Sequence, residues 1–267
     1  MVSRLIHRHV VADGCFPGAS VGQLSDVTCG DIAIFGVNVV AALAIRDAAN
    51  AHFSRAEALC RRIDLGNLGE AIDRLPAVLH DIEARGARSF MLGGDPEMGT
   101  TFFEALAKTP GSAPPSIILL SPRIDVRLPQ AGTFQAVAIG TQRLIGQSTY
   151  DAWREAGGKV VPAATYDANC ADKILSAMAT KVRTALLLVD LAVIDTGYAA
   201  GALMRNVGGL SPMAVLDLVD RIISQFDLRG LALLNIAPDR DPRGHSERIA
   251  AIIADRVCAQ DQSGQAA

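Results

Sequence analysis

The residues best suited to chemistry follow short apolar runs of the chain. Four such junctions are Gly93-Gly94-Asp95-Pro96, Ser121-Pro122-Arg123-Ile124-Asp125, Asp190-Leu191-Ala192-Val193-Ile194-Asp195 and Asn235-Ile236-Ala237-Pro238. They include the carboxylates of Asp95, Asp125 and Asp190. Carboxylates that converge in space bind a hard cation or a guanidinium, or hold loops together through hydrogen bonds. We therefore expect these junctions to form the functional site if the fold brings them to one place.

The runs before these junctions have the character of strands buried on both faces of a parallel sheet, because several are continuously apolar. The predicted strands are Ile32–Val37, Ser89–Leu92, Ser116–Leu120, Ala136–Ile139, Lys159–Pro162, Ala185–Val189 and Leu231–Ile236. Helical patterns alternate with them, which predicts an α/β protein with three α/β/α layers and a mostly parallel sheet. Ligands of such sheets bind beyond the carboxyl ends of the strands, where the four junctions lie.

Three predicted helices have recognisable limits. The segment Leu68–Ala84 carries apolar residues at helical spacing. Ser211 suits an N-cap and Pro212 the first helical position of a helix that extends to Phe226. A last helix is predicted over Ser246–Val257. We expect one domain over residues 1–260 and a frayed tail over 261–267.

Composition limits the partners of the protein. The 267 residues include 25 basic and 28 acidic side chains, for a net charge of −3, and aromatic residues make up only 4%. This balance argues against nucleic-acid binding. The longest apolar stretch, Ile32–Ile45, is too short for a membrane span. Five dispersed cysteines without a C-x-x-C pair indicate reduced thiols and a cytoplasmic protein.

The four junctions, taken with three further segments in the same order, resemble the arginase–agmatinase (ureohydrolase) family. Those segments are Ala44-Ile45-Arg46, Asp64-Leu65-Gly66-Asn67 and Gly208-Gly209-Leu210-Ser211. The resemblance spans about Ile32 to Val257 and implies an arginase-like fold. It also implies two manganese ions that hold a hydroxide for attack on a guanidinium carbon, with release of urea, and assembly into trimers or hexamers.

The metal ligands implied by this resemblance are mostly replaced. Asp125 and Asp190 remain, whereas Asp195 matches an acid that belongs to the turn. The family's other ligands, and the glutamate that binds its guanidinium substrate, correspond to Pro96, Ser121, Arg123, Ala192 and Asn235. No histidine occurs between His80 and His245, so this region lacks imidazole ligands.

Arg123 occupies a position where the family has a histidine ligand. A guanidinium stays protonated and repels a dication, so we expect Arg123 to form ion pairs with Asp125 or Asp190 in its place. Asp95, which follows two glycines, fits a turn residue better than a catalyst. These substitutions predict a protein without a metal cofactor. The alternative is a manganese ion on Asp125 and Asp190.

Three functions stay open from the sequence. The favoured one is a pseudoenzyme of the ureohydrolase fold that serves as a structural or regulatory subunit, as a homo-oligomer or beside an active paralogue. The second is a divergent amidinohydrolase that cleaves C–N bonds of a guanidino or amide compound with a reorganised site. The third is a sensor that keeps a small-molecule pocket without the chemistry. Fold alone does not choose among them, because function depends on the site.

Overall fold

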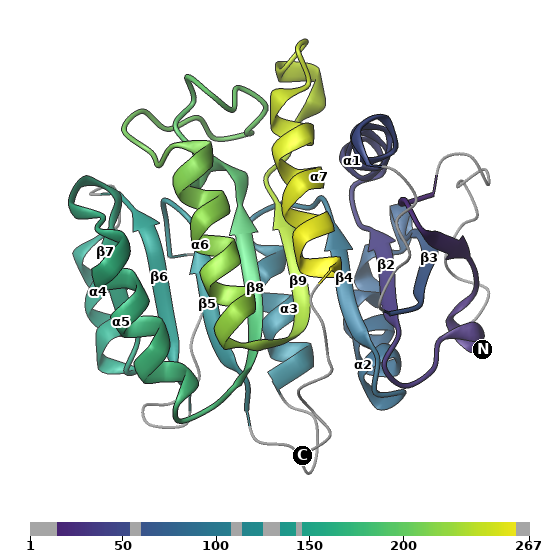
Figure 1. The fold of residues 1–267 in the computed structure, drawn as a ribbon, viewed down its shortest axis with the longest axis horizontal. Helices are drawn as coiled ribbons and strands as arrows, with labels where there is room; N and C mark the ends of the chain where they lie inside the picture. The colour runs from purple at the N-terminus through teal and green to yellow at the C-terminus, as the bar shows by residue number, and fades with distance from the viewer. Residues whose placement is uncertain (1–14, 54–59, 108–113, 125–133, 143–145, 260–267) are drawn as a thin grey trace.

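The computed structural model describes residues 15–53, 60–107, 114–124, 134–142 and 146–259 (Figure 1). Within these residues, nine strands form one sheet in the order β1-β3-β2-β4-β9-β8-β5-β6-β7, with parallel pairing throughout. The strands are β1 (Ala19–Val21), β2 (Ile32–Gly36), β3 (Arg62–Asn67), β4 (Arg88–Leu92), β5 (Ser116–Leu120), β6 (Ala136–Thr141), β7 (Lys159–Pro162), β8 (Thr184–Asp190) and β9 (Asp227–Leu234).

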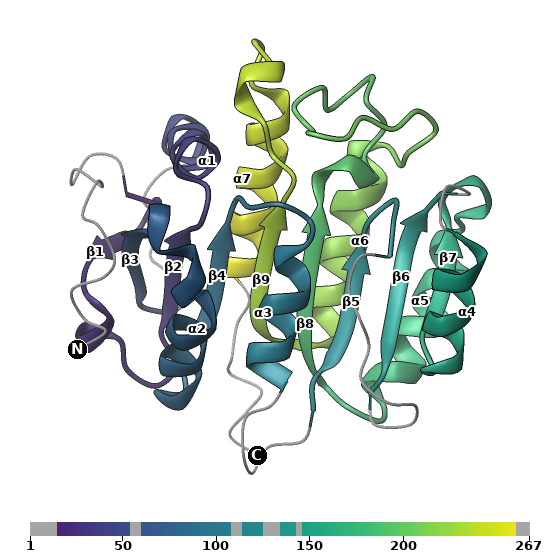
Figure 2. The ribbon, with the colours of Figure 1, turned by 180° about the vertical axis from the view of Figure 1, so that it is seen from behind.

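Helices cover both faces of the sheet, which confirms the predicted α/β/α layers. One face is covered by α1 (Val39–His52), α5 (Ala168–Ala179), α6 (Pro212–Gln225) and α7 (His245–Cys258), as Figure 1 shows. The other face, seen in Figure 2, is covered by α2 (Leu75–Ala84), α3 (Met98–Ala107) and α4 (Gln147–Glu155). Each face has its own apolar cluster, so the central strands are buried on both sides.

The seven predicted strands correspond to β2 and to β4 through β9, with end shifts of up to four residues. Strands β1 and β3 were not predicted. The predicted helix at Leu68 begins as a 3-10 segment over Gly69–Arg74, and the α-helix α2 starts only at Leu75. Ser211 caps α6 as expected, since its side chain accepts a hydrogen bond from the Ala214 amide. The tail predicted from residue 261 lies outside the described residues, and the domain limits stay a prediction.

No described helix is long and apolar enough to cross a membrane.

Candidate functional site

The four junctions follow four neighbouring strands in the middle of the sheet. Strands β4, β9, β8 and β5 lie side by side and parallel, so their carboxyl ends share one edge. In Figure 2 this edge is the upper one, where the chain leaves β4, β9, β8 and β5. The fold therefore places the turns after these strands next to one another, as the parallel arrangement requires.

Asp190, the last residue of β8, is the centre of the polar contacts at this edge. Its side chain is buried, with 1% of the residue exposed. Oδ1 accepts hydrogen bonds from the Ala192 amide at 2.9 Å and from Asn235 Nδ2 at 2.6 Å. Oδ2 accepts one from the Ser121 hydroxyl at 3.2 Å. All three donors are neutral, and they come from the turns after β8, β9 and β5.

Asn235 connects the other turns to Asp190. Its backbone has a φ of 63°, a left-handed conformation that asparagine tolerates better than most residues. Its amide donates to the Gly94 carbonyl at 2.8 Å, and its Oδ1 accepts from the Leu203 amide at 2.9 Å. These contacts define the orientation of the side-chain amide, because its oxygen faces a backbone donor and its nitrogen faces a carboxylate. One asparagine thus joins three loops.

Burial dominates the electrostatics of Asp190. Loss of solvent raises the pKa of this carboxyl to about 6, although hydrogen bonds from Asn235, Ala192 and Ser121 oppose the rise. The positive charge of Arg123 also lowers this pKa, as the smallest of the favourable contributions. The half-buried Arg123 lies beside Ser121, whose hydroxyl accepts a hydrogen bond from the Arg123 amide at 3.2 Å. Arg123 and Asp190 are therefore electrostatically coupled.

The other residues predicted for the site lie outside this network or enter it through their backbone. Asp95 is exposed in the turn into α3, where its carbonyl accepts from the Met98 amide. Pro96 belongs to the same turn, and its carbonyl accepts from the Gly99 amide. Ala192 contributes its amide to Asp190, and its methyl group is buried. Asp125 lies outside the described residues.

Asp195 holds a loop together and is not part of the Asp190 network. Its two oxygens accept from the Gly197 amide at 2.8 Å and the Gly208 amide at 2.6 Å, and these backbone donors lower its pKa. Gly209 belongs to the same closure, because a Cβ there would lie 2.6 Å from the Asp195 nitrogen. The double glycine before α6 therefore serves a close backbone approach.

A second buried polar cluster joins two segments that carry the family resemblance. Arg46 of α1 donates from Nε and Nη2 to the two oxygens of Asp64 on β3, both at 2.8 Å. Arg46 also donates to Asn67 Oδ1 at 2.9 Å, and both ends of the ion pair are fully buried. The Phe16 and Gly66 amides complete the coordination of Asp64. This cluster attaches α1 to β3.

The described residues at the Asp190 edge do not supply the ligands of a dimanganese centre. Such a centre needs bridging carboxylates and enough further ligands to hold both ions. Within the described ranges, no group of three or more His, Cys, Asp or Glu side chains could hold a metal ion. The Asp190 carboxylate is already engaged by three donors, and Asn235 presents amide hydrogens, which cannot bind a cation.

Comparison with solved structures defines the class of fold. The agmatine ureohydrolase of Thermoplasma volcanium aligns with a TM-score of 0.73 and 17% identity, covering 97% of this chain and 96% of that one. The formimidoylglutamase of Bacillus subtilis aligns with a TM-score of 0.74 and 18% identity, over 94% and 92% of the two chains. The arginase of Bacillus caldovelox gives 0.71 and 16%, over 86% and 98%. The fold is that of the ureohydrolases.

The family follows from the sequence comparison. Residues 127–259, about half of the chain, match the model of the Arginase family. The chain belongs to the arginase family, as a divergent member. A search of curated proteins by sequence found no significant match.

Sequence reasoning missed two buried arginines at the opposite edge of the sheet. Arg62 and Arg88 are the first residues of β3 and β4, and only 7% and 4% of them is exposed. A signal was present for Arg88, since it directly precedes the predicted strand Ser89–Leu92. Charged residues at strand starts are usually solvated, so this signal does not by itself predict burial.

Proposed function

We propose that the protein is a non-catalytic member of the arginase family that works as a structural or regulatory subunit. One observation carries this proposal: the Asp190 carboxylate accepts hydrogen bonds from Ser121, Ala192 and Asn235. In the family, the matching aspartate is a metal ligand. Here the same carboxylate holds three loops together through neutral donors.

Metal binding at this edge would require the hydrogen bonds to Asp190 to break. A dication would have to displace the Asn235 and Ser121 donors from Asp190, and it would meet the charge of Arg123 nearby. Arginine is always protonated, so this repulsion persists at every working pH. Replacing a carboxylate by Ala192 removes a further ligand. The preferred arrangement is therefore a metal-free, hydrogen-bonded edge.

Metal content tests this proposal. We expect no stoichiometric manganese, nickel or zinc to remain on the purified protein after loading and dialysis, measured by plasma mass spectrometry. Urea release from arginine, agmatine or guanidinobutyrate is expected at background with or without manganese. The matched control is a variant that restores the family's ligands by Pro96→His, Ser121→Asp, Arg123→His and Ala192→Asp, in which manganese affinity should increase. Retained manganese in the unaltered protein, with urea release that Asp190→Asn abolishes, would overturn the proposal.

A subunit role requires an assembly, and exposed apolar side chains support one. Tyr198, Met204 and Val207 are 55%, 47% and 84% exposed in the loop between β8 and α6. We propose that the protein forms a homo-oligomer or joins a metal-competent relative in the cytoplasm. Light scattering tests the first arrangement, and co-purification of that relative from the native host tests the second. If the protein is a monomer and no such relative co-purifies with it, both arrangements are contradicted.

A divergent amidinohydrolase is the second candidate, and the raised pKa of Asp190 favours it. A buried carboxyl with a pKa of about 6 is suited to proton transfer near neutral pH. This candidate predicts that urea release changes with pH around that value and is lost in Asp190→Asn. Asp195→Asn is the control, because its carboxylate lies in the loop closure and does not contact Asp190.

A further inference from the structure

Two arginines share one face of the sheet at the edge opposite to Asp190. In the strand register, Ile32 of β2 lies opposite Arg62 of β3 on one side and opposite Arg88 of β4 on the other. Residues paired across parallel strands point to the same face of a sheet. Both guanidinium groups therefore lie on the face covered by α1 and α7, where Ile32 packs.

These arginines are buried with little compensation for their charge. Among the described residues, none of the three guanidinium nitrogens of Arg88 has a hydrogen-bond partner. Arg62 donates from Nη1 to the Pro17 carbonyl at 3.1 Å, while its Nε has no partner in the described part of the chain. Arg62 Nη1 lies 4.0 Å from a carboxylate oxygen of Asp255, whose side chain is one-third exposed. Among the described residues, the positive charge of the pair exceeds the negative charge that contacts it.

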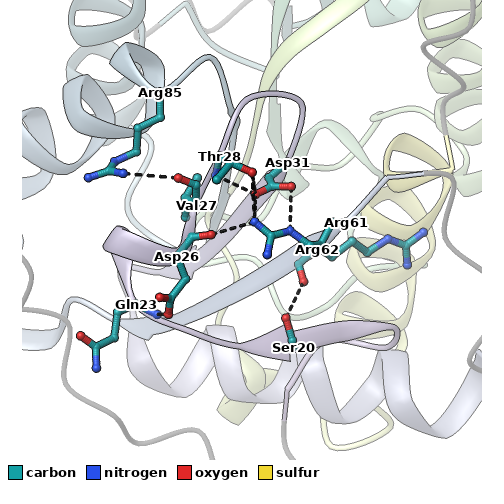
Figure 3. Close-up of polar contacts among 9 residues, drawn as sticks. All are labelled: Ser20, Gln23, Asp26, Val27, Thr28, Asp31, Arg61, Arg62 and Arg85. Atoms are coloured by element: carbon teal, nitrogen blue, oxygen red, sulfur yellow. Dashed lines mark hydrogen bonds and ion pairs between the residues drawn. The ribbon is translucent and has the colours of Figure 1, made fainter.

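The preceding residue, Arg61, lies at the same end of the strands and provides a comparison, because its guanidinium has hydrogen-bond acceptors. Arg61 donates to both oxygens of Asp31, at 3.0 and 2.6 Å, and to Thr28 Oγ1 and the Asp26 carbonyl (Figure 3). Figure 3 shows the Arg62 side chain turned away from this group, as alternation along the strand requires. Arg61 is half exposed and has a carboxylate partner, whereas the buried Arg88 has no hydrogen-bonded carboxylate among the described residues.

In the described part of the chain, the titratable groups that act on Arg88 do not neutralise its charge. They are the thiols of Cys60 and Cys258 and the guanidinium of Arg62. Burial raises the pKa of Cys258 to about 12, so this thiol stays neutral and carries no compensating charge. The Cys60 thiol interacts with Arg88 as a hydrogen-bond acceptor, but sulfur accepts weakly and this thiol does not satisfy the guanidinium. Burying a guanidinium without a strong acceptor is unfavourable, and Arg88 does not escape the cost by deprotonation.

We propose that Arg62 and Arg88 form a binding site for a small oxyanion, of the phosphate or sulfate class, between the starts of β3 and β4 and the C-terminal turn of α7. Two guanidinium forks present the planar donors that tetrahedral oxyanions accept best. An oxyanion there balances the excess charge and gives the Arg88 nitrogens acceptors. This site is independent of the proposed function, because it lies at the other edge of the sheet from Asp190.

Thermal unfolding with and without inorganic phosphate tests the site. The reference is a chloride buffer of the same ionic strength. Relative to it, we expect phosphate and sulfate to raise the Tm of the protein by about 3–8 °C when their concentration is roughly tenfold to a hundredfold above Kd. Calorimetric titration should give one phosphate per chain, which sulfate displaces. Arg88→Met should weaken phosphate binding about tenfold or more, since it removes charge-assisted hydrogen bonds.

Arg85→Met is the matched control, because it removes the same charge at the same end of the strands, and the exposed Arg85 side chain donates to the Val27 carbonyl (Figure 3). It should leave the phosphate response unchanged. Arg88→Met should also be as stable as the unaltered protein in phosphate-free buffer, because the buried charge is gone.

Two results would overturn the proposal. The first is an equal Tm shift in the unaltered protein and in Arg88→Met, which marks a general salt effect. The second is a large loss of stability in Arg88→Met with no phosphate response in either protein, which assigns the acceptor to a carboxylate of the chain itself. Should Arg88→Met not fold, the calorimetric stoichiometry of the unaltered protein decides: one displaceable phosphate supports the site, and none contradicts it.

Discussion

Asp64 and Asp190 are both buried aspartates on parallel strands, yet the negative charges of their carboxylates are compensated in different ways. Asp64 receives the guanidinium fork of Arg46, which lies only 18 residues before it in the chain and is equally buried. Asp190 receives neutral donors from three separate loops, and Arg123 acts on it as a weaker influence. Both residues belong to segments that carry the family resemblance.

This difference in partners makes the charge of Asp64 structural and leaves the carboxyl of Asp190 able to titrate. A bidentate arginine compensates Asp64 inside the fold, so that cluster needs nothing further. Neutral hydrogen bonds compensate Asp190 only in part, and burial still raises its pKa to about 6. Among the described residues, neutral donors and the charge of Arg123 surround this carboxylate. Three predictions test this contrast, in order of decreasing effect.

Arg46→Met should have the largest effect, because it leaves the fully buried Asp64 carboxylate without its cation. We expect the free energy of unfolding to fall by about 3–5 kcal/mol, measured by urea denaturation. Arg61→Met is the control, since it breaks the ion pair with Asp31 at a half-exposed position, where solvent screens the interaction. Equal losses in the two variants would show that the buried pair is no stronger than the exposed one.

Asp190→Asn should alter the pH dependence of stability. The pKa of Asp190 is about 6 in the folded protein against an ordinary value of 3.8, so the native state binds the proton more tightly than the unfolded state. This contribution to stability is complete below the unfolded pKa and is lost as the pH rises through the folded pKa. The unaltered protein should therefore lose roughly 1–3 kcal/mol between about pH 4 and pH 7 that Asp190→Asn does not lose.

Asp195→Asn provides the control for this measurement. The pKa of Asp195 is lowered by backbone donors, so its contribution has the opposite sign and disappears only in acid. It should leave the slope between pH 4 and pH 7 unchanged. If Asp190→Asn retains the slope of the unaltered protein, the titrating group is elsewhere and the contrast with Asp64 fails.

Arg123→Met should have the smallest effect. Removing this charge raises the pKa of Asp190 further and penalises its ionised form, so the loss should be about 1 kcal/mol at pH 8 and less at pH 5. Arg123→Lys keeps a positive charge and should restore most of the difference between the two pH values. A loss that is the same at both pH values would mean that Arg123 acts through packing and not through Asp190.

Patterns in the chain predicted most of the fold because the central strands are continuously apolar. The capping pair Ser211 and Pro212 likewise marked the start of α6. Strand β3 was not predicted, since it carries Arg62, Asp64 and Gly66 within six residues. The Asp64 and Asn67 side chains of this strand are buried because Arg46 approaches them from a helix, and no local pattern shows such a partner. Strand β1 has only three residues and pairs with β3 alone.

The candidate site was predictable in its residues but not in its contacts. Parallel strands required that Ser121, Asp190 and Asn235 come to one edge. The left-handed backbone of Asn235, which turns its amide nitrogen to Asp190 and its oxygen to the Leu203 amide, depends on tertiary contacts. The expected ion pair of Arg123 with Asp125 involves a residue outside the described ranges, and it stays a prediction.

The position of β9 has a consequence for how the chain is completed during synthesis. In the described sheet, β9 is the last strand made, yet it lies between β4 and β8 and is the connection between β1 to β4 and β5 to β8. Until residues 227–234 leave the ribosome, the two half-sheets have no shared strand, and each has an unpaired edge strand. Unpaired edge strands can form hydrogen bonds with strands of other chains. The nascent protein is thus most exposed to aggregation just before its final strand arrives, and insertion of that strand joins the two halves into one sheet.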